Sequence, residues 1–217
     1  MYLKYGKRAL DLLIAIGALA VLFPLLLLIA LLVRLDVGSP VLFRQPRTGL
    51  RGESFIALKF RSMREALDAA GRPLTDDSDE ANATARSGAR ITRFGRLLRE
   101  ASFDELAGLL NVLRGEMSIV GPRPLVVRYL DRYTEEQMRR HDVRPGITGL
   151  AQINGRQDMP FEERFKLDVF YVDNVSLRLD LWIIARTPLE VIRRRGVSET
   201  GYATGSEFLG TTTGDAD

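Results

Sequence analysis

Hydrophobic residues are distributed unevenly along the chain. Leu12 to Val33 is a run of 22 residues without a charge, and a helix of that length is long enough to cross ~30 Å of hydrocarbon. Beyond it, short apolar runs alternate with polar turns, which is typical of a globular domain. We therefore expect a membrane anchor over residues 1–36, a globular domain over 37–200 and a polar tail over 201–217.

Two features of the anchor argue against an ordinary single-pass helix. Pro24 lies near its middle, where a proline removes a backbone hydrogen bond and can bend a helix. Basic residues lie on both sides, including Lys7 and Arg8 before the run and Arg34 after it. Positive flanks favour the cytoplasmic side, so we expect a re-entrant helix that breaks at Pro24; a single-pass anchor is the alternative. Asp11 is expected to pair with Lys7 or Arg8, because an unpaired charge in the membrane is costly.

The pattern after residue 36 predicts an α/β domain of the α+β type that is mostly helical. Apolar runs at 40–43 and 55–60 surround a turn-rich segment and indicate a small β-hairpin. Helical periodicity or composition predicts six helices, at 91–100, 102–115, 125–132, 135–141, 161–172 and 181–195. The last two combine aromatic and aliphatic residues with arginines, which suits helices in a membrane interface as well as helices packed on the domain core. A polar loop is expected at 68–88.

Composition excludes some kinds of site. The 217 residues contain no cysteine, so disulfides and thiolate metal sites are excluded. The formal net charge is only +3. This mild excess argues against a nucleic-acid-binding protein but permits contact with membrane lipids that carry negative charge.

The segment from Arg99 to Pro124 carries the candidate chemistry. The carboxylates of Asp104 and Glu105 follow Arg99, and Pro122 and Pro124 restrict the backbone on both sides of Arg123. Anionic groups thus lie between cations. The alternative interpretation is structural, because Ser102 followed three residues later by Glu105 matches a helix capping box.

Two further features are weaker. Glycines at 146, 149 and 155 suit a loop whose backbone approaches a ligand closely, and the adjacent Arg156 could bind an anionic group. The single histidine, His141, stands among charged residues, and we expect it at the surface.

Together the motifs resemble a known family. The matching segments are Lys7–Asp11, the proline-containing helix, Gly38–Val41, Lys59–Met63, Ser102–Leu106, Asn111–Leu113, Gly121–Pro124, Arg144–Gly149 and Asp168–Asp180. In this order they resemble the monotopic phosphoglycosyl transferases of the bacterial sugar transferase family, in their minimal catalytic form. The faint similarity of the segment 201–210 to the branch that uses diacetylated bacillosamine suggests that sugar.

The resemblance implies transfer of a phosphosugar from a UDP-sugar to polyprenyl (undecaprenyl) phosphate with release of UMP. Asp104 matches the nucleophile, which forms a covalent intermediate and binds Mg²⁺, and Glu105 matches its partner in the dyad. Cations match phosphate- or nucleotide-binding positions, namely Lys59, Arg99, Arg123 and Arg156. The family also implies a re-entrant anchor in the bacterial inner membrane, a catalytic domain facing the cytoplasm, and downstream glycosyltransferases as partners in glycoconjugate or exopolysaccharide synthesis. A membrane-tethered scaffold without turnover is the alternative.

Overall fold

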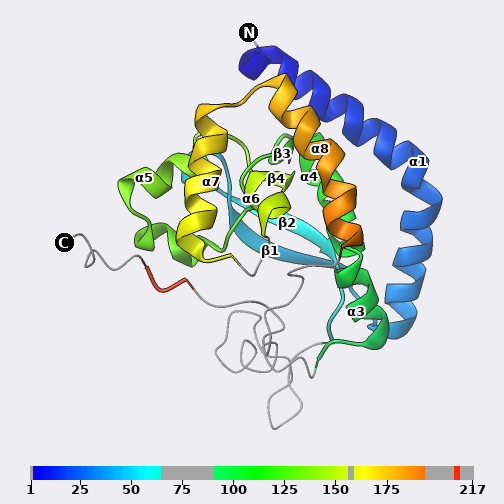
Figure 1. Cartoon of the computed structure of the whole chain (residues 1–217). Helices are drawn as coiled ribbons and strands as arrows, with labels where there is room; N and C mark the ends of the chain where they lie inside the picture. The colour runs from blue at the N-terminus through cyan, green and yellow to red at the C-terminus, as the bar shows by residue number, and fades with distance from the viewer. Residues whose placement is uncertain (1, 65–89, 156–158, 194–207, 211–217) are drawn as a thin grey trace.

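The computed structural model describes residues 2–64, 90–155, 159–193 and 208–210. A short π-helix, Tyr2–Gly6, leads into α1, Lys7–Asp36, and a hairpin of β1, Leu42–Thr48, and β2, Ser54–Phe60, follows. The rest of the described chain is mostly helical around a second small sheet (Figure 1). The predicted α+β class is confirmed. The predicted polar loop at 68–88 lies outside the described residues.

Helix α1 runs along one side of the whole domain. It continues through Pro24 as one helix of 30 residues, and Figure 1 shows it changing direction along its length rather than ending. Among the described residues, it is the one helix long and apolar enough to cross a membrane. Its outer face exposes large apolar side chains, including Leu13, Ile16, Val21, Phe23, Leu27, Leu28, Leu31 and Leu35. An apolar surface of this kind marks a membrane or protein contact.

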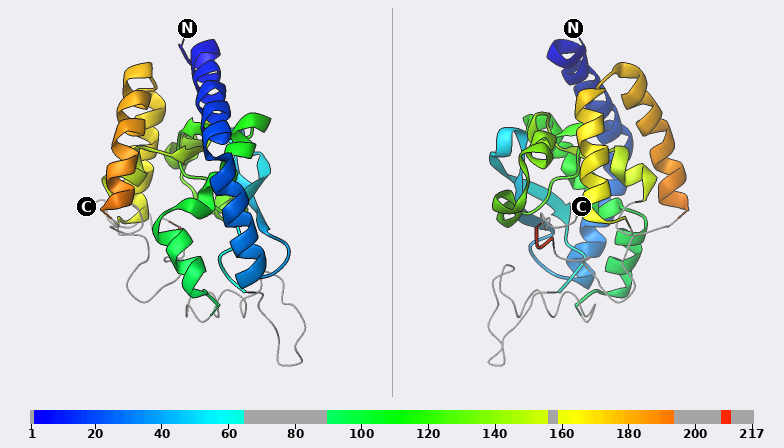
Figure 2. Two further views of the ribbon diagram at one scale, coloured as in Figure 1. Left: turned by 90° about the vertical axis from the view of Figure 1, so that its right-hand side faces the viewer. Right: turned by 60° about the vertical axis from the view of Figure 1, so that its left-hand side comes forward.

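Both halves of α1 pack on the same domain. In its first half, the fully buried Ala15 belongs to a core cluster with Val112 and Ile183. In its second half, Ile29 and Val33 belong to another cluster, which is formed with residues of β2, α3 and the segment after it. The left view of Figure 2 shows α1 alongside the domain from top to bottom. Neither end of the helix therefore projects away from the domain.

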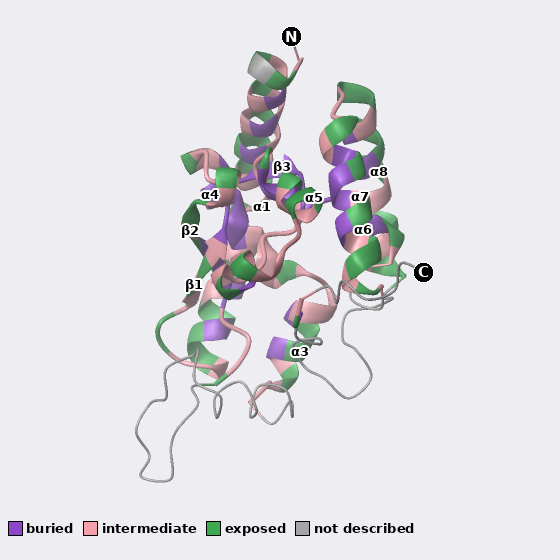
Figure 3. Cartoon of the chain, turned by 90° about the vertical axis from the view of Figure 1, so that its left-hand side faces the viewer, coloured by how far each residue is buried: buried purple, intermediate pink, exposed green. Residues whose placement is uncertain are grey.

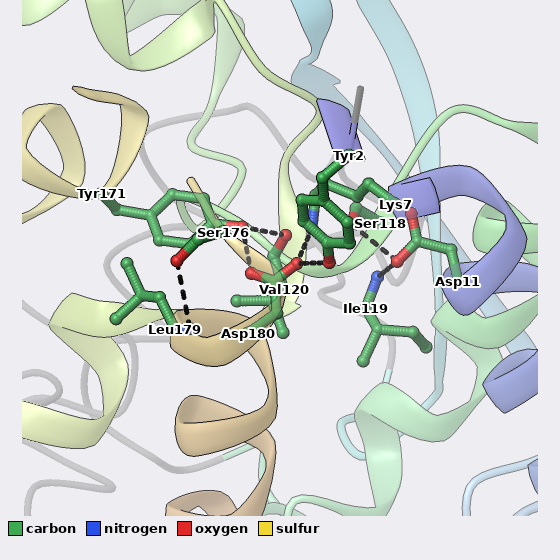
Figure 4. A network of polar contacts seen from close by, with 10 residues as sticks. All are labelled: Tyr2, Lys7, Asp11, Ser118, Ile119, Val120, Tyr171, Ser176, Leu179 and Asp180. Atoms are coloured by element: carbon green, nitrogen blue, oxygen red, sulfur yellow. Dashed lines mark hydrogen bonds and ion pairs between the residues drawn. The ribbon is translucent and has the colours of Figure 1, made fainter. Parts of the chain in front are cut away.

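Buried polar contacts fix the first turns of α1 (Figure 4). The Lys7 ammonium lies 2.8 Å from Oδ2 of Asp180, whose side chain is fully buried. Oδ1 of Asp180 accepts a hydrogen bond of 2.7 Å from the Tyr171 hydroxyl. The predicted partner of Asp11 was wrong: its carboxylate accepts from the Ser118 hydroxyl and the Ile119 amide. Donors on β3 replace the nearby cations because they face Asp11 across the helix–strand contact.

The predicted hairpin is confirmed. Strands β1 and β2 pair antiparallel from Leu42 opposite Phe60 to Thr48 opposite Ser54, so β1 extends further than expected. The fully buried Asn111 connects the hairpin to α4, Leu109–Arg114. Its amide oxygen accepts from the Leu58 amide and its nitrogen donates to the Ile56 carbonyl. This side chain holds β2 in place beside the segment that carries Asp104.

The predicted helix from 102 to 115 is divided. Helix α3, Arg93–Glu100, ends before Ser102, which has a left-handed backbone (φ 57°) and makes no capping hydrogen bond with its side chain. A 3₁₀-helix, Phe103–Gly108, precedes α4. The predicted capping box was therefore wrong, because Ser102 has a left-handed backbone in place of the extended one that is typical of a capping residue. The predicted end at Gly115 is confirmed, as its left-handed φ of 83° ends α4.

A second sheet, which the sequence pattern did not predict, consists of β3, Ser118–Val120, and β4, Gly146–Thr148, in parallel. The backbones approach closely beyond β3, since a Cβ at Gly146 would lie 2.1 Å from the nitrogen of Gly121. A Cβ at Gly149 would lie 2.2 Å from the Gly121 oxygen. These glycines were expected to admit a ligand, but the structure shows that they admit another backbone. Helix α6, Leu150–Asn154, follows.

The remaining elements are all helical. They are the 3₁₀-helices Leu50–Gly52, Val127–Arg132 and Arg139–His141, and the α-helices α5 (Glu135–Met138), α7 (Phe161–Asp173) and α8 (Leu177–Ile192). In Figure 3, buried positions of α7 face the domain and exposed ones face outward. Phe208 from the tail is buried with Tyr129 and Phe165, a contact that the polar composition of the tail did not reveal.

His141 is buried and not at the surface as expected; its side chain lies against Tyr133, with ring centroids 5.4 Å apart. The predicted surface position was wrong because charged neighbours in the sequence do not imply exposure: Arg140, directly before His141, is itself buried. Burial and the charge of Arg140 lower the pKa of His141 to about 4.

Removal of the Lys7 cation tests the anchor of α1. In the Lys7→Ala variant, Asp180 stays buried without its ion-pair partner, so the free energy of unfolding in detergent should fall by about 3 kcal/mol or more. The control Lys166→Ala removes an exposed lysine of α7 and should change the free energy of unfolding by less than about 0.5 kcal/mol. Equal effects of the two substitutions would contradict the anchoring role.

His141 should make the stability depend on pH. Its folded pKa of about 4 lies below the unfolded value of about 6.5, so its contribution is complete above pH 6.5 and is lost as the pH falls toward 4. Between pH 7 and pH 5, this residue should account for about 2 kcal/mol of lost stability. Chemical unfolding of wild type and His141→Gln at both pH values measures the difference, because the variant retains every other titrating group. Identical pH dependence in both proteins would exclude a buried neutral histidine.

Candidate active site

Three segments far apart in the sequence meet at the Glu105 carboxylate. Lys59, at the end of β2, places its ammonium 2.9 Å from Oε1. Arg123, in the turn after β3, donates to both carboxylate oxygens, at 2.6 Å to Oε1 and 3.2 Å to Oε2. A two-pronged arginine–carboxylate contact fixes orientation as well as distance. The three side chains are partly exposed, between 21% and 36%, so the cluster is accessible from solvent.

Asp104 lies beside this cluster but is held differently. Within the described part of the chain, its carboxylate has no hydrogen-bond partner. Burial raises the pKa of Asp104, the charge of Lys59 opposes this, and the neighbouring Glu105 adds to the rise. Arg99 and Arg123 also act on Asp104 through their charges, in the direction that favours the anion. Asp104 is therefore an available carboxylate in a cationic environment, whereas Glu105 is already engaged.

The charges of the cluster depend on one another. Burial alone would raise the pKa of Glu105, but Arg123 and Lys59 outweigh it and hold that pKa well below its usual range. Burial lowers the pKa of Lys59, and Glu105 opposes that effect. In Arg99, burial lowers the pKa of the guanidinium and Asp104 opposes it. Cations and carboxylates thus stabilise each other's charged forms.

Local backbone geometry brings the two carboxylates to this place. The left-handed Ser102 separates α3 from the 3₁₀-helix that presents Asp104 and Glu105. Arg123 lies between Pro122 and Pro124. This turn follows Gly121, whose backbone contacts the start of β4 so closely that no side chain would fit. A short helix and a restricted turn therefore meet at the contact between Glu105 and Arg123, next to Lys59 of β2.

A small pocket with a volume of about 40 Å³ opens beside Glu105. Its lining includes Arg47, Lys59, Glu105, Met117, Arg123 and Ile147. Arg47 was not among the predicted site residues. Its guanidinium hydrogen-bonds the Gln45 side chain, and burial and the charge of Arg123 lower its pKa to about 10. The alternation of β1 could have indicated that Arg47 shares a face with Gln45, but not that Arg47 lines the pocket.

The structure brings together five of the predicted site residues: Lys59, Arg99, Asp104, Glu105 and Arg123. The sixth, Arg156, lies outside the described residues, and Pro24 lies in α1. Among the residues described, no group of three or more histidine, aspartate or glutamate side chains could hold a metal ion by itself. An Mg²⁺ ion is commonly bound through one or two carboxylates and the phosphates of a substrate, and the available Asp104 fits that donor set.

Comparisons with known proteins agree on one family. The family described as bacterial sugar transferase matches residues 2–194. The chain is 47% identical over 204 residues to the uncharacterized sugar transferase EpsL of Bacillus subtilis (strain 168), covering 94% of this chain and 96% of that protein. It is 42% identical over 197 residues to the exopolysaccharide production protein ExoY of Rhizobium meliloti (strain 1021), covering 88% and 87%.

A further relative has a name that states a reaction. The chain is 40% identical over 202 residues to the UDP-glucose:undecaprenyl-phosphate glucose-1-phosphate transferase of Xanthomonas campestris pv. campestris. The match covers 89% of this chain but only 40% of that protein.

Substitution of Glu105 tests the geometry of the cluster. In Glu105→Gln, Lys59 and Arg123 face each other without the carboxylate between them, so the free energy of unfolding should fall by about 1–3 kcal/mol. Glu190 offers a matched control because it also lies near two cations, Arg186 and Arg193, which are 43% and 55% exposed. Glu190→Gln should change stability by less than about 1 kcal/mol. Equal losses in chemical unfolding would contradict the mutual stabilisation of the cluster.

Proposed function

This chain belongs to the bacterial sugar transferase family, and from that premise we propose that it transfers a phosphosugar from a UDP-sugar to polyprenyl phosphate with release of UMP. The observation that carries the proposal is the pairing of an available carboxylate, Asp104, with an engaged one, Glu105, among Lys59, Arg99 and Arg123. Two adjacent carboxylates with different environments suit two different roles. Three cations suit the phosphates of a nucleotide sugar.

Asp104 is the proposed nucleophile. One of its carboxylate oxygens attacks the β-phosphorus of the UDP-sugar, and the bond from that phosphorus to the bridging oxygen breaks. The bridging oxygen leaves on UMP, and the phosphosugar remains on Asp104 as an acyl phosphate. An oxygen of polyprenyl phosphate then attacks the same phosphorus, which frees the carboxylate and yields a diphosphate-linked lipid. The raised pKa of Asp104 supports this role, because a less stabilised carboxylate is the more basic nucleophile.

The other residues position the substrates and neutralise the charge of their phosphates. Glu105 holds Arg123 and Lys59 at hydrogen-bonding distance, which presents their remaining donors to phosphate oxygens and sets the place of the acceptor. Arg99 acts on Asp104 through its charge, which favours the ionised carboxylate. Asp104 would hold Mg²⁺ together with the diphosphate, where the ion supplies neutralisation of phosphate charge. Arg156 is the proposed contact to the nucleotide.

The acceptor is a lipid, and the placement of α1 supports a site at the membrane. The family and the apolar outer face of α1 support membrane association. A helix that crossed the bilayer would have its ends on opposite sides, whereas both halves of α1 contact one domain. We infer that α1 enters one leaflet and returns, and that the catalytic domain faces the cytoplasm of a bacterial inner membrane. The exposed Leu181, Trp182 and Leu189 of α8 would lie in the interface.

UMP release by the purified chain in nanodiscs tests the proposal. The assay contains Mg²⁺, undecaprenyl phosphate and a panel of UDP-sugars that includes UDP-glucose, UDP-galactose and UDP-diacetylbacillosamine. We expect release with one donor and a loss of about 10²-fold or more in Asp104→Asn, because the amide removes the nucleophile. The control Asp131→Asn changes an exposed aspartate and should keep its activity.

Intact mass adds a readout of the intermediate. Without acceptor, the wild type should gain the mass of one phosphosugar and Asp104→Asn should not. Equal UMP release by Asp104→Asn would contradict the assignment of the nucleophile. A wild type that releases no UMP from any donor and gains no mass would instead favour a scaffold role.

A further inference from the structure

A buried ion pair lies behind the active-site turn. Arg140 and Asp168 connect the 3₁₀-helix Arg139–His141 to α7, and their side chains are only 2% and 4% exposed. The Arg140 guanidinium donates to Oδ2 of Asp168 from Nε at 3.1 Å and from Nη2 at 2.7 Å. Neither residue lines the pocket beside Glu105.

The same guanidinium makes a third contact, and this one reaches the active site. Its Nη2 donates to the backbone carbonyl of Arg123 at 2.8 Å. The side chain of Arg123 is the group that holds both oxygens of Glu105. Arg123 therefore links Arg140 to Glu105, because Arg140 holds its backbone carbonyl and its own guanidinium holds the Glu105 carboxylate.

Aromatic rings enclose the pair and restrict its movement. The Arg140 guanidinium carbon lies 5.3 Å from the ring centroid of Phe165 and 5.8 Å from that of Tyr133. Phe208 packs against both rings, at 5.1 Å and 5.6 Å between centroids. Cation–π contacts and the fork of hydrogen bonds leave the guanidinium one well-defined position.

Stability alone does not explain such a pair, since a buried ion pair often stabilises a fold no better than apolar side chains of similar volume. The contact to Arg123 is what apolar residues could not supply. We propose that Arg140, held by Asp168, is a positioning residue for phosphosugar transfer: it fixes the Pro122–Arg123–Pro124 turn so that Arg123 meets Glu105 and the substrate phosphate. This inference rests on the proposed function.

A double-mutant cycle between Arg140 and Arg123 tests the proposal. Lysine at 140 keeps the charge but cannot make all three hydrogen bonds, so Arg140→Lys should lower the rate of UMP release about tenfold. In an Arg123→Lys background, where no fork to Glu105 exists to be positioned, the same change should have less than about a twofold effect. A general structural role would give equal factors in both backgrounds, so additivity would overturn the proposal.

Arg139 and Asp173 provide the matched control. They join the same two elements by an ion pair whose side chains are 46% and 45% exposed. Arg139→Lys should leave both the rate and the coupling unchanged. Should Arg140→Lys fail to fold, Asp168→Asn gives the second measurement, because it removes the support of Arg140 while keeping its donor to Arg123. That variant should again lower the rate, and its effect should again shrink when Arg123 is lysine.

The outcomes separate this inference from the proposed function. An inactive wild type would overturn both. An active wild type with an unchanged rate in Arg140→Lys, or with additive effects, would overturn the positioning role and leave the transferase assignment intact.

Discussion

The carboxylate of Glu105, held between Lys59 and Arg123, is the contact on which the arrangement of the site depends. It joins the end of β2, the 3₁₀-helix after α3 and the turn after β3 at a single point. The cations of this partly buried cluster would repel one another without an anion between them. Because Glu105 takes that place, the adjacent Asp104 stays free of hydrogen bonds to the described residues and available for chemistry. A second engaged carboxylate would leave the proposed mechanism without a nucleophile.

This contact is useful only where donor and acceptor can meet. The donor proposed here is soluble and the acceptor is confined to a bilayer, so the site must lie at the boundary between them. Polar anchors at the start of α1, made by Lys7 with Asp180 and by Asp11 with Ser118, fix the apolar helix to the same domain that carries the site. The apolar face of α1 and the Glu105 cluster thereby belong to one set of packed elements.

Sequence reasoning succeeded where a structure is signalled by neighbouring residues. The hairpin was predicted correctly because turn residues between apolar runs are a local signal. Adjacent carboxylates are also a local signal, which singled out Asp104 and Glu105 as candidates. It failed where partners are distant. The sequence predicts that Asp11 pairs with the nearest cations, but its partners lie on β3. It also predicts a surface position for His141, because burial against α7 cannot be inferred from neighbouring residues. The parallel strands β3 and β4 were missed because three residues are too few to show alternation.

The same limit explains why Arg140 could not be distinguished from Arg139 in the sequence. Both are arginines of one short helix, and both pair with an aspartate of α7. Burial distinguishes the two pairs. The exposed pair of Arg139 and Asp173 can be replaced by contacts with water at little cost in free energy. Loss of one partner from the buried pair of Arg140 and Asp168 would leave the other charge buried and unpaired. A buried guanidinium whose position is fixed by packed rings can hold a backbone carbonyl at one position, as Arg140 holds that of Arg123. The burial of one arginine and the exposure of its neighbour therefore assign them different roles, although the sequence presents them as equals.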